Sequence, residues 1–130
     1  MTPDASEEMA QQLDVYVKAV LERKAEALVA LNVRELTSVA DAFLICSGRS
    51  NRQVTAIADS VQRTLKKQGI RPLSVEGKSE GHWVLMDYGE VVIHIFYETT
   101  REFYDLEGLW RDADKVTTAS MEGERLKTEG

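Results

Sequence analysis

Cysteine, proline and histidine are scarce in this chain, and the lone cysteine already excludes whole classes of protein. Of 130 residues, one is cysteine, two are proline and two are histidine. A single cysteine, Cys46, excludes a disulfide framework and a thiolate metal cluster within one chain. Because Cys46 follows the apolar run Phe43-Leu-Ile45, we expect a small buried thiol in a strand rather than a reactive group.

Long apolar segments are also missing. No apolar run approaches the ~20 residues that cross a bilayer. The first residues, Met1-Thr-Pro-Asp-Ala-Ser-Glu-Glu, have neither the basic region nor the apolar region of a signal peptide. We therefore expect a cytoplasmic protein without membrane contact.

Positive charge is in short supply. The chain carries 16 Lys and Arg against 22 Asp and Glu, a formal net charge of −6, and its pI is about 5.0. Nonspecific nucleic-acid binding depends on neutralising phosphates with Lys and Arg, so no direct specific nucleic-acid binding is expected. An acidic domain is better matched to a basic protein partner or a small ligand.

Catalytic constellations are hard to find. The turn Ser47-Gly-Arg-Ser50 precedes a predicted helix, where a phosphate could bind, and it favours a nucleotide-binding or nucleotidyl-transfer enzyme as an alternative function. Such an enzyme would need clustered carboxylates for Mg²⁺. No Asp-x-Asp pair places two carboxylates on one side of a strand. His82 and His94 are expected on opposite faces, so no metal pair forms. We expect neither an enzyme nor a cofactor.

What the sequence does contain is a clear alternation of elements. Apolar spacing predicts helices over residues 6–24 and 50–68 and a short one over 101–110, with strands over 27–32, 41–47 and 73–76 and a hairpin over 82–97. This order indicates an α/β (α+β) fold with a mixed five-stranded sheet and helices mainly on one face. The other face should be open. We expect one domain, residues 1–112, and a disordered tail, residues 113–130.

The hairpin is the most informative segment, because its two faces differ. With Tyr88-Gly89 as the two loop residues, Trp83 would pair with His94, Leu85 with Val92, and Asp87 with Glu90. One face is then aliphatic and should pack against the apolar core. The other carries Trp, His and carboxylates, and we expect it to touch another molecule, with Trp83 as the anchor. The aliphatic face comprises Val84, Met86, Val91, Ile93 and Ile95.

Several stretches, taken in order, carry a family resemblance that covers residues 13–112. They are Asp41-Ala-Phe-Leu-Ile-Cys-Ser-Gly48, Ser50-Asn-Arg-Gln-Val54 followed by Ala56-Ile-Ala-Asp59, Glu76-Gly77, the hairpin from Trp83 to Phe96, and Arg101-Glu-Phe-Tyr-Asp-Leu-Glu-Gly-Leu-Trp110. Together they resemble the ribosomal silencing factor family (RsfS, Iojap-like). Ala40 stands where the family often has Thr, and Glu90 where it often has Asp.

The resemblance implies a non-enzymatic factor that binds the large ribosomal subunit. Family members contact the universal large-subunit ribosomal protein fourteen at the intersubunit face and block joining of the small subunit, which represses translation. Organellar relatives act in large-subunit assembly, which is a second alternative. The implied fold is similar to nucleotidyltransferases without their catalytic carboxylates. Homodimers are also known in the family.

The resemblance also implies a set of contact residues. Trp83 matches the tryptophan of the family motif. Leu85, Asp87 and His94 are included because they also match that motif and share a face with Trp83 in the predicted hairpin register. The acidic side chains of the set would form ion pairs with Lys or Arg on the ribosomal protein. Such pairs determine orientation and association rate more than affinity. The expected neighbours are Tyr88, Glu90, Arg101 and Tyr104.

Overall fold

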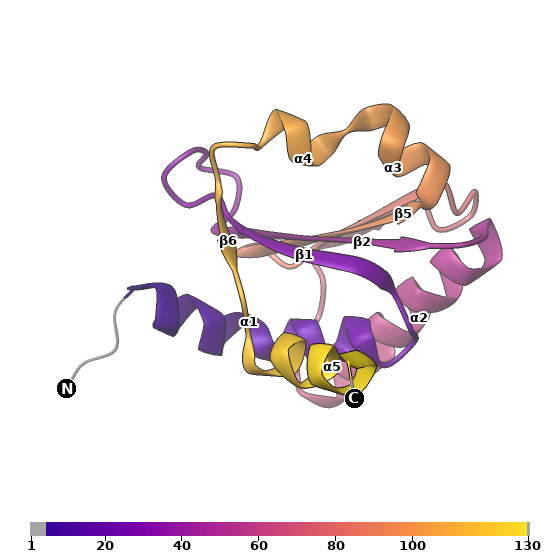
Figure 1. Ribbon diagram of the computed structural model, residues 1–130. Coiled ribbons are helices and arrows are strands. Elements are labelled where there is room, and N and C mark those ends of the chain that lie inside the picture. Colours follow the sequence, from indigo (N-terminus) through magenta and orange to yellow (C-terminus); the bar gives the residue numbers. More distant parts are fainter. Residues whose placement is uncertain (1–4, 130) are drawn as a thin grey trace.

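A mixed β-sheet forms the middle layer of the protein, and helices lie on both of its sides (Figure 1). The computed structural model describes residues 5–129. The sheet has six strands in the order β3-β4-β5-β2-β1-β6. In chain order the elements are α1 (Ala5–Leu21), β1 (Glu26–Asn32), β2 (Ala42–Gly48), α2 (Asn51–Lys67), β3 (Ser74–Glu76), β4 (Trp83–Asp87), β5 (Val91–Tyr97), α3 (Glu98–Tyr104), α4 (Leu106–Leu109), β6 (Asp114–Val116) and α5 (Ala119–Glu129).

The strand pairing confirms the predicted α+β fold with a mixed sheet. Strands β2 and β5 pair in parallel, and α2 lies in the connection between them. The other neighbouring strands pair antiparallel. The predicted number of five strands is wrong, because β6 adds a sixth strand beside β1.

Helix α2 begins and ends at the residues that its sequence indicates. The Ser50 hydroxyl accepts the Gln53 amide at 3.1 Å, which satisfies one of the free N–H groups of the first turn. The Gln53 side chain reaches back to the amide of Arg49 at 2.6 Å, one residue earlier than a standard capping box. At the other end Gly69 has a φ of 79°. The amides of Gly69 and Ile70 bond the carbonyls of Lys66 and Leu65, which is a Schellman ending.

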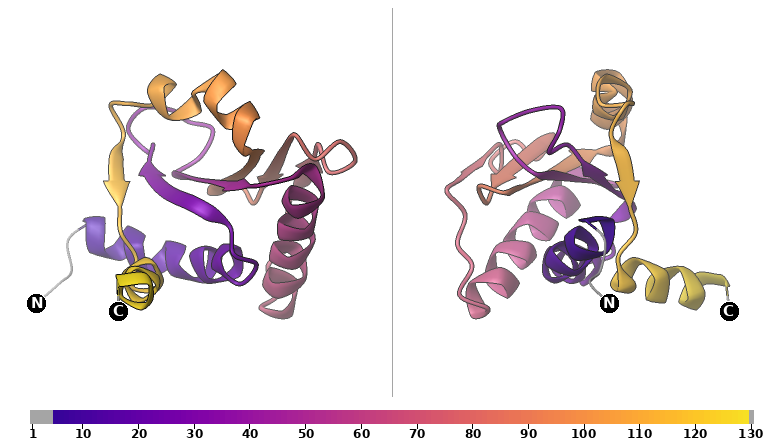
Figure 2. Two further views of the ribbon diagram at one scale, coloured as in Figure 1. Left: turned by 45° about the vertical axis from the view of Figure 1, so that its right-hand side comes forward. Right: turned by 90° about the vertical axis from the view of Figure 1, so that its left-hand side faces the viewer.

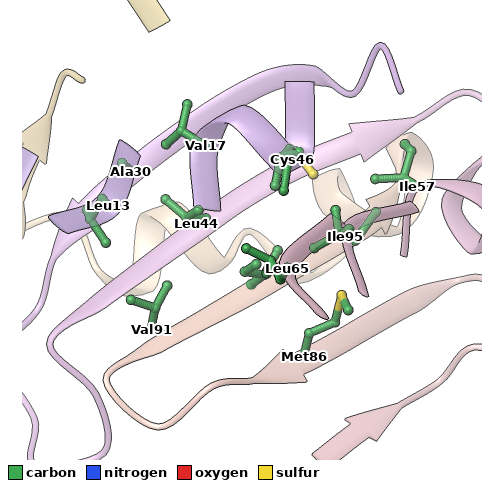
Figure 3. Close-up of a cluster of buried hydrophobic side chains, with 14 of the residues drawn as sticks. Leu13, Val17, Ala30, Leu44, Cys46, Ile57, Leu65, Met86, Val91 and Ile95 are labelled. Atoms are coloured by element: carbon green, nitrogen blue, oxygen red, sulfur yellow. The ribbon is translucent and has the colours of Figure 1, made fainter. Parts of the chain in front are cut away.

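The main apolar core lies between the sheet and helices α1 and α2. Side chains from both layers converge there (Figure 3), and the labelled ones are buried in a single cluster. The aliphatic hairpin face faces this core, as predicted, since its five residues are all 5% exposed or less. Cys46 is a buried thiol in the same cluster, and burial raises its pKa to about 12.

A second core occupies the opposite side of the sheet, where the sequence predicted an open face. Phe43, Val92 and Phe96 are buried there, and Leu106 and Trp110 pack against them from the α4 segment. Figure 1 shows α3 and α4 on the side of the sheet opposite α1, α2 and α5. The expectation of an open face is therefore wrong. The physical reason is that β2 is buried along its whole length, and a strand that is apolar on both faces needs cover on both.

The predicted disordered tail forms β6 and α5 instead. β6 pairs with β1, and Val116 is 8% exposed. Helix α5 then packs across α1 (Figure 2), where the Asp14 carboxylate accepts the amide of Ser120 at 2.9 Å and its hydroxyl at 2.8 Å. Thr118 is 1% exposed, and its hydroxyl accepts the Met121 amide. A few well-placed side chains therefore order a segment whose overall composition is polar.

Gly123→Ala is expected to stabilise α5. Gly123 lies inside the helix, and a Cβ added there would meet nothing within 4 Å. Alanine lowers the conformational entropy of the unfolded chain, a gain of about 0.5–1 kcal/mol. Amide hydrogen exchange in α5 should slow accordingly. Gly69→Ala is the matched control: it also has open space but a φ of +79°, so it should destabilise instead. Equal effects at both positions would contradict this reasoning.

Candidate functional site

The hairpin turn lies one residue later than predicted. Trp83 pairs with Phe96, Leu85 with His94, and Asp87 with Val92. The loop residues are Gly89 and Glu90, since the Tyr88 amide bonds the Val91 carbonyl at 2.9 Å. Glycine supplies the positive φ, 89°, at the first loop position, and the Asp87 carboxylate accepts the Gly89 amide at 2.8 Å. The predicted pairs are therefore wrong by two residues. A shift of two leaves every strand side chain on its predicted face.

The predicted site residues do not all lie on one side of the sheet. Trp83, Leu85 and His94 lie on the side that α3 and α4 cover. Tyr88 packs on the α1 side, with its ring 5.6 Å from that of Tyr16. Glu90 lines a pocket against α1. The structure therefore separates the expected contact set into two places.

His94 lies behind Trp83 rather than at the surface. It is 5% exposed, and its Nδ1 accepts the Trp83 indole N–H at 3.1 Å. The ring of Phe43 meets His94 edge-on at 5.1 Å. Its Nε2 has no hydrogen-bond partner among residues 5–129. Burial lowers the pKa of His94 to about 4. His94 is thus a neutral residue that orients the indole, and it is not placed to touch a partner directly.

The burial of His94 predicts a loss of stability in acid. In the unfolded chain His94 takes up a proton below its ordinary pKa of 6.5, whereas the folded protein resists protonation down to about 4. Stability is therefore complete above pH 6.5 and falls as the pH drops to 4, by roughly 3 kcal/mol. Urea unfolding at each pH measures this loss. His94→Gln cannot titrate, so its stability should depend less steeply on pH across this window; an identical dependence would rule out the assignment.

An exposed aromatic surface is built around Trp83. The indole stacks on Phe96 at 4.8 Å and contacts the ring of Tyr104 at 5.1 Å. Tyr104 is 55% exposed, and its neighbour Phe103 is 80% exposed. We call Trp83, Phe103 and Tyr104 the aromatic surface. A hollow of about 450 Å³ lies against it, lined by His82, Trp83, Tyr97, Thr99, Thr100, Phe103 and Tyr104.

Phe103 is an exposed aromatic residue whose position the sequence did not reveal. In an unbroken helix over residues 101–110, Phe103 would lie on roughly the same side as Leu106 and Leu109. The helix is in fact broken at Asp105, which has a φ of 45° and caps α4. The break turns Phe103 outward and leaves Leu109 76% exposed. An Asp between two short apolar stretches was the only signal of this break, since Asp enters the left-handed region more readily than most residues.

Arg101 fixes α3 against the sheet rather than pointing outward. Its Nε donates to the Glu107 carboxylate at 2.7 Å, and Nη1 donates to the Ser47 hydroxyl at 2.7 Å. Only 11% of its side chain is exposed. Because Tyr104 lies one helical turn further along α3, this anchor also positions the aromatic surface.

The turn before α2 already uses part of its hydrogen-bonding capacity within the protein. Its Arg49 and Gln53 amides are taken by the side chains of Gln53 and Ser50, and the Arg49 guanidinium pairs with Glu26 at 2.7 Å. Within residues 5–129 no group of three or more His, Cys, Asp or Glu side chains could hold a metal ion. No helix in the same range is long and apolar enough to cross a membrane.

Comparison with known proteins decides the family. The family model described as "Ribosomal silencing factor during starvation" matches residues 6–129. The chain belongs to the ribosomal silencing factor (RsfS) family. The ribosomal silencing factor RsfS of Halalkalibacterium halodurans is 45% identical over 104 residues, which are 80% of this chain and 89% of that protein. The Bacillus subtilis RsfS is 42% identical over 101 residues, 78% of this chain and 86% of that protein.

The fold is shared as well as the sequence. A crystal structure of a Chromobacterium violaceum protein matches with a TM-score of 0.74 and 35% identity, over 87% of this chain and 92% of the other. RsfS membership makes this chain a non-catalytic, ribosome-binding factor in translation regulation, and it sets aside the nucleotidyl-transfer alternative. The family match also includes β6 and all of α5, which the sequence resemblance over residues 13–112 left out.

Proposed function

We propose that this protein binds the large ribosomal subunit and sterically prevents the small subunit from joining, in the cytoplasm. Membership of the RsfS family is the observation that carries the proposal. The expected contact is the large-subunit ribosomal protein fourteen, at the face where the subunits meet. The net charge of −6 suits a basic ribosomal protein and disfavours direct phosphate contact.

The aromatic surface is the proposed docking site. Monomeric proteins rarely expose large neighbouring aromatic side chains without a role in binding. Phe103 and Tyr104 are exposed, while Trp83 is held from behind by His94 and Phe96. Such an arrangement is preorganised, because little side-chain freedom remains to be lost on binding. Two of the three rings belong to α3. Figure 1 shows α3 on the side of the sheet opposite α1 and α2.

The proposed contact set combines the exposed rings with the side chains around them. Trp83, Phe103 and Tyr104 make the apolar centre, with the half-buried Leu85 and Asp87 beside them on β4. His94 and Arg101 support this surface from within. Aromatic centres with polar rims are the usual anatomy of protein interfaces.

A subunit-mixing experiment tests the function. Purified large subunits are incubated with this protein, small subunits are added, and the products are separated on a sucrose gradient. We expect separate subunits in place of joined ribosomes, with this protein migrating with the large subunit. Joined ribosomes at saturating protein would contradict the proposal. Cross-linking within the complex should capture large-subunit ribosomal protein fourteen, and capture of other proteins alone would move the docking site.

Self-association through the aromatic surface would compete with docking. The family resemblance predicts homodimers, and burying Phe103 and Tyr104 between two copies would remove exposed apolar area from water. Sedimentation equilibrium measures the association. A dimer that Phe103→Ser leaves intact would show that the contact between copies lies elsewhere.

A further inference from the structure

A second recess lies on the α1 side of the sheet, at the end of β4 that is far from Trp83. We call it the α1–hairpin pocket. It is about 330 Å³ in volume and is bounded by α1, the start of β2 and the hairpin tip. Its floor is apolar, since Met9, Leu13 and Val91 are 2%, 2% and 5% exposed. Its rim is polar and includes Tyr16 and Glu90. An apolar floor under a polar rim suits a ligand with an aliphatic stem and a polar end.

The charge at this rim is negative and uncompensated. Glu90 is exposed and has no ion-pair partner among residues 5–129. Asp41, the other rim carboxylate, pairs with Arg34 at 3.5 Å. Tyr16 and Glu90 line the same pocket, and burial raises the pKa of Tyr16 while the charge of Glu90 raises it further. An anion would be repelled here, whereas a cation would find its counter-charge.

Tyr16 adds an aromatic ring beside Glu90 at the rim of the pocket. The rings of Tyr16 and Tyr88 meet at 62° with their centroids 5.6 Å apart. Tyr88 itself does not line the pocket, and its buried hydroxyl has no hydrogen-bond partner among the described residues. Aromatic faces attract cations, and a tyrosine oxygen can accept a hydrogen bond from one.

We propose that the α1–hairpin pocket binds an arginine or lysine side chain of the ribosomal partner. The aliphatic stem would lie on the floor formed by Met9, Leu13 and Val91, and the cationic end would meet Glu90 beside Tyr16. Long basic side chains bind in this way, with the stem on apolar surface and the charge at its edge. Only the identity of the partner rests on the proposed function; the cation site itself rests on the pocket.

The pocket gives the partner a second point of contact, separate from the aromatic surface. Trp83 begins β4 and Glu90 lies in the turn after it, so the five-residue strand, about 13 Å, lies between them. Two contacts at opposite ends of one rigid hairpin fix orientation as well as affinity. Glu90 and Asp87 are only three residues apart, but Glu90 lines the pocket on the α1 side and Asp87 lies on the same face of β4 as Trp83.

Titration with a small cation tests the pocket without any ribosome. N-acetylarginine amide is the probe, and N-acetylcitrulline amide, which replaces the guanidinium with a neutral urea, is its control. We expect saturable methyl shifts of Met9, Ile70 and Val91 in the NMR spectrum with the first compound only. Shifts that fail to saturate, or that citrulline reproduces, would overturn the proposal. The result does not depend on whether the protein blocks subunit joining, so the two proposals fail separately.

Matched variants then identify the counter-charge and the partner. Glu90→Gln should weaken arginine binding about fivefold, whereas Glu80→Gln, another exposed carboxylate, should leave it unchanged. Glu90→Gln should also weaken binding to large subunits and reduce its dependence on salt. If Glu90→Gln binds large subunits as the parent does, the ribosomal partner does not use this pocket. If it binds arginine as the parent does, Glu90 is not the counter-charge.

Discussion

Replacing Trp83 with alanine is expected to weaken binding to large ribosomal subunits about 30-fold or more. Central tryptophans of interfaces cost 2 kcal/mol or more when truncated. Here the indole contacts Phe96 and Tyr104 and donates to His94, so its removal also frees the Tyr104 ring that shares the surface. Co-sedimentation of the protein with large subunits, over a range of concentrations, measures the change in Kd.

Two variants separate docking from stability. Leu106→Ala removes a side chain that packs in the same second core but is not part of the aromatic surface. It should lower the unfolding midpoint and leave subunit binding within about twofold of the parent. Trp83→Phe keeps an aromatic ring and loses the hydrogen bond to His94, so its affinity should lie between those of the parent and Trp83→Ala. If Leu106→Ala and Trp83→Ala bind equally weakly, the binding loss reflects stability, and Trp83 is not the anchor.

The elements that the sequence predicted best are those with strong periodic patterns. The helical stripe of α2, with its serine cap and its glycine ending, was predicted to within a residue at each end. The hairpin faces were predicted although the register was not, because strand side chains alternate with a period of two. Trp83 and His94 share a face under either pairing. Face assignment was therefore more robust than pairing.

Elements that depend on tertiary contacts were missed. The segment after β5 is too short for a clear helical period, and the left-handed conformation at Asp105 divides it into two helices. β6 is three residues long, and it is ordered by pairing with β1, far away in the sequence. No local pattern encodes such a pairing. The first of these errors concerns the cover of the sheet and explains why the second face was expected to be open, whereas β6 extends the sheet at its edge.

Burial and turn geometry also divided the candidate site. His94 was placed in the contact set by family match and register, but a residue on that face of a central strand can be buried beneath its neighbours. Tyr88 and Glu90 lie at the turn, where alternation no longer decides direction, and both serve the α1 side. Sequence reasoning thus identified the hairpin and the face that carries Trp83, while the sides of the turn residues required the structure.

Gly77→Ala is expected to destabilise the protein by on the order of 4 kcal/mol. A Cβ at this position would lie 2.0 Å from the carbonyl oxygen of Trp83, and the backbone φ is +89°. Neither atom of this clash can move easily. The Trp83 oxygen is a backbone atom, and the added Cβ would be bonded directly to the backbone of residue 77. The turn over residues 77–81 is also held to α2, because the Thr55 hydroxyl donates to the Lys78 carbonyl at 2.9 Å. Urea unfolding measures the loss.

Gly69→Ala isolates the cause of that loss. Gly69 has a similar φ, +79°, but a Cβ there would meet nothing within 4 Å, so only the backbone cost of about 1 kcal/mol should appear. The difference between the two variants is then the cost of the clash with Trp83. If the backbone yields instead, Trp83 must shift, and the Gly77→Ala protein should lose subunit affinity out of proportion to its stability. Equal destabilisation by the two variants, with unchanged subunit binding, would show that Gly77 does not set the position of the anchor.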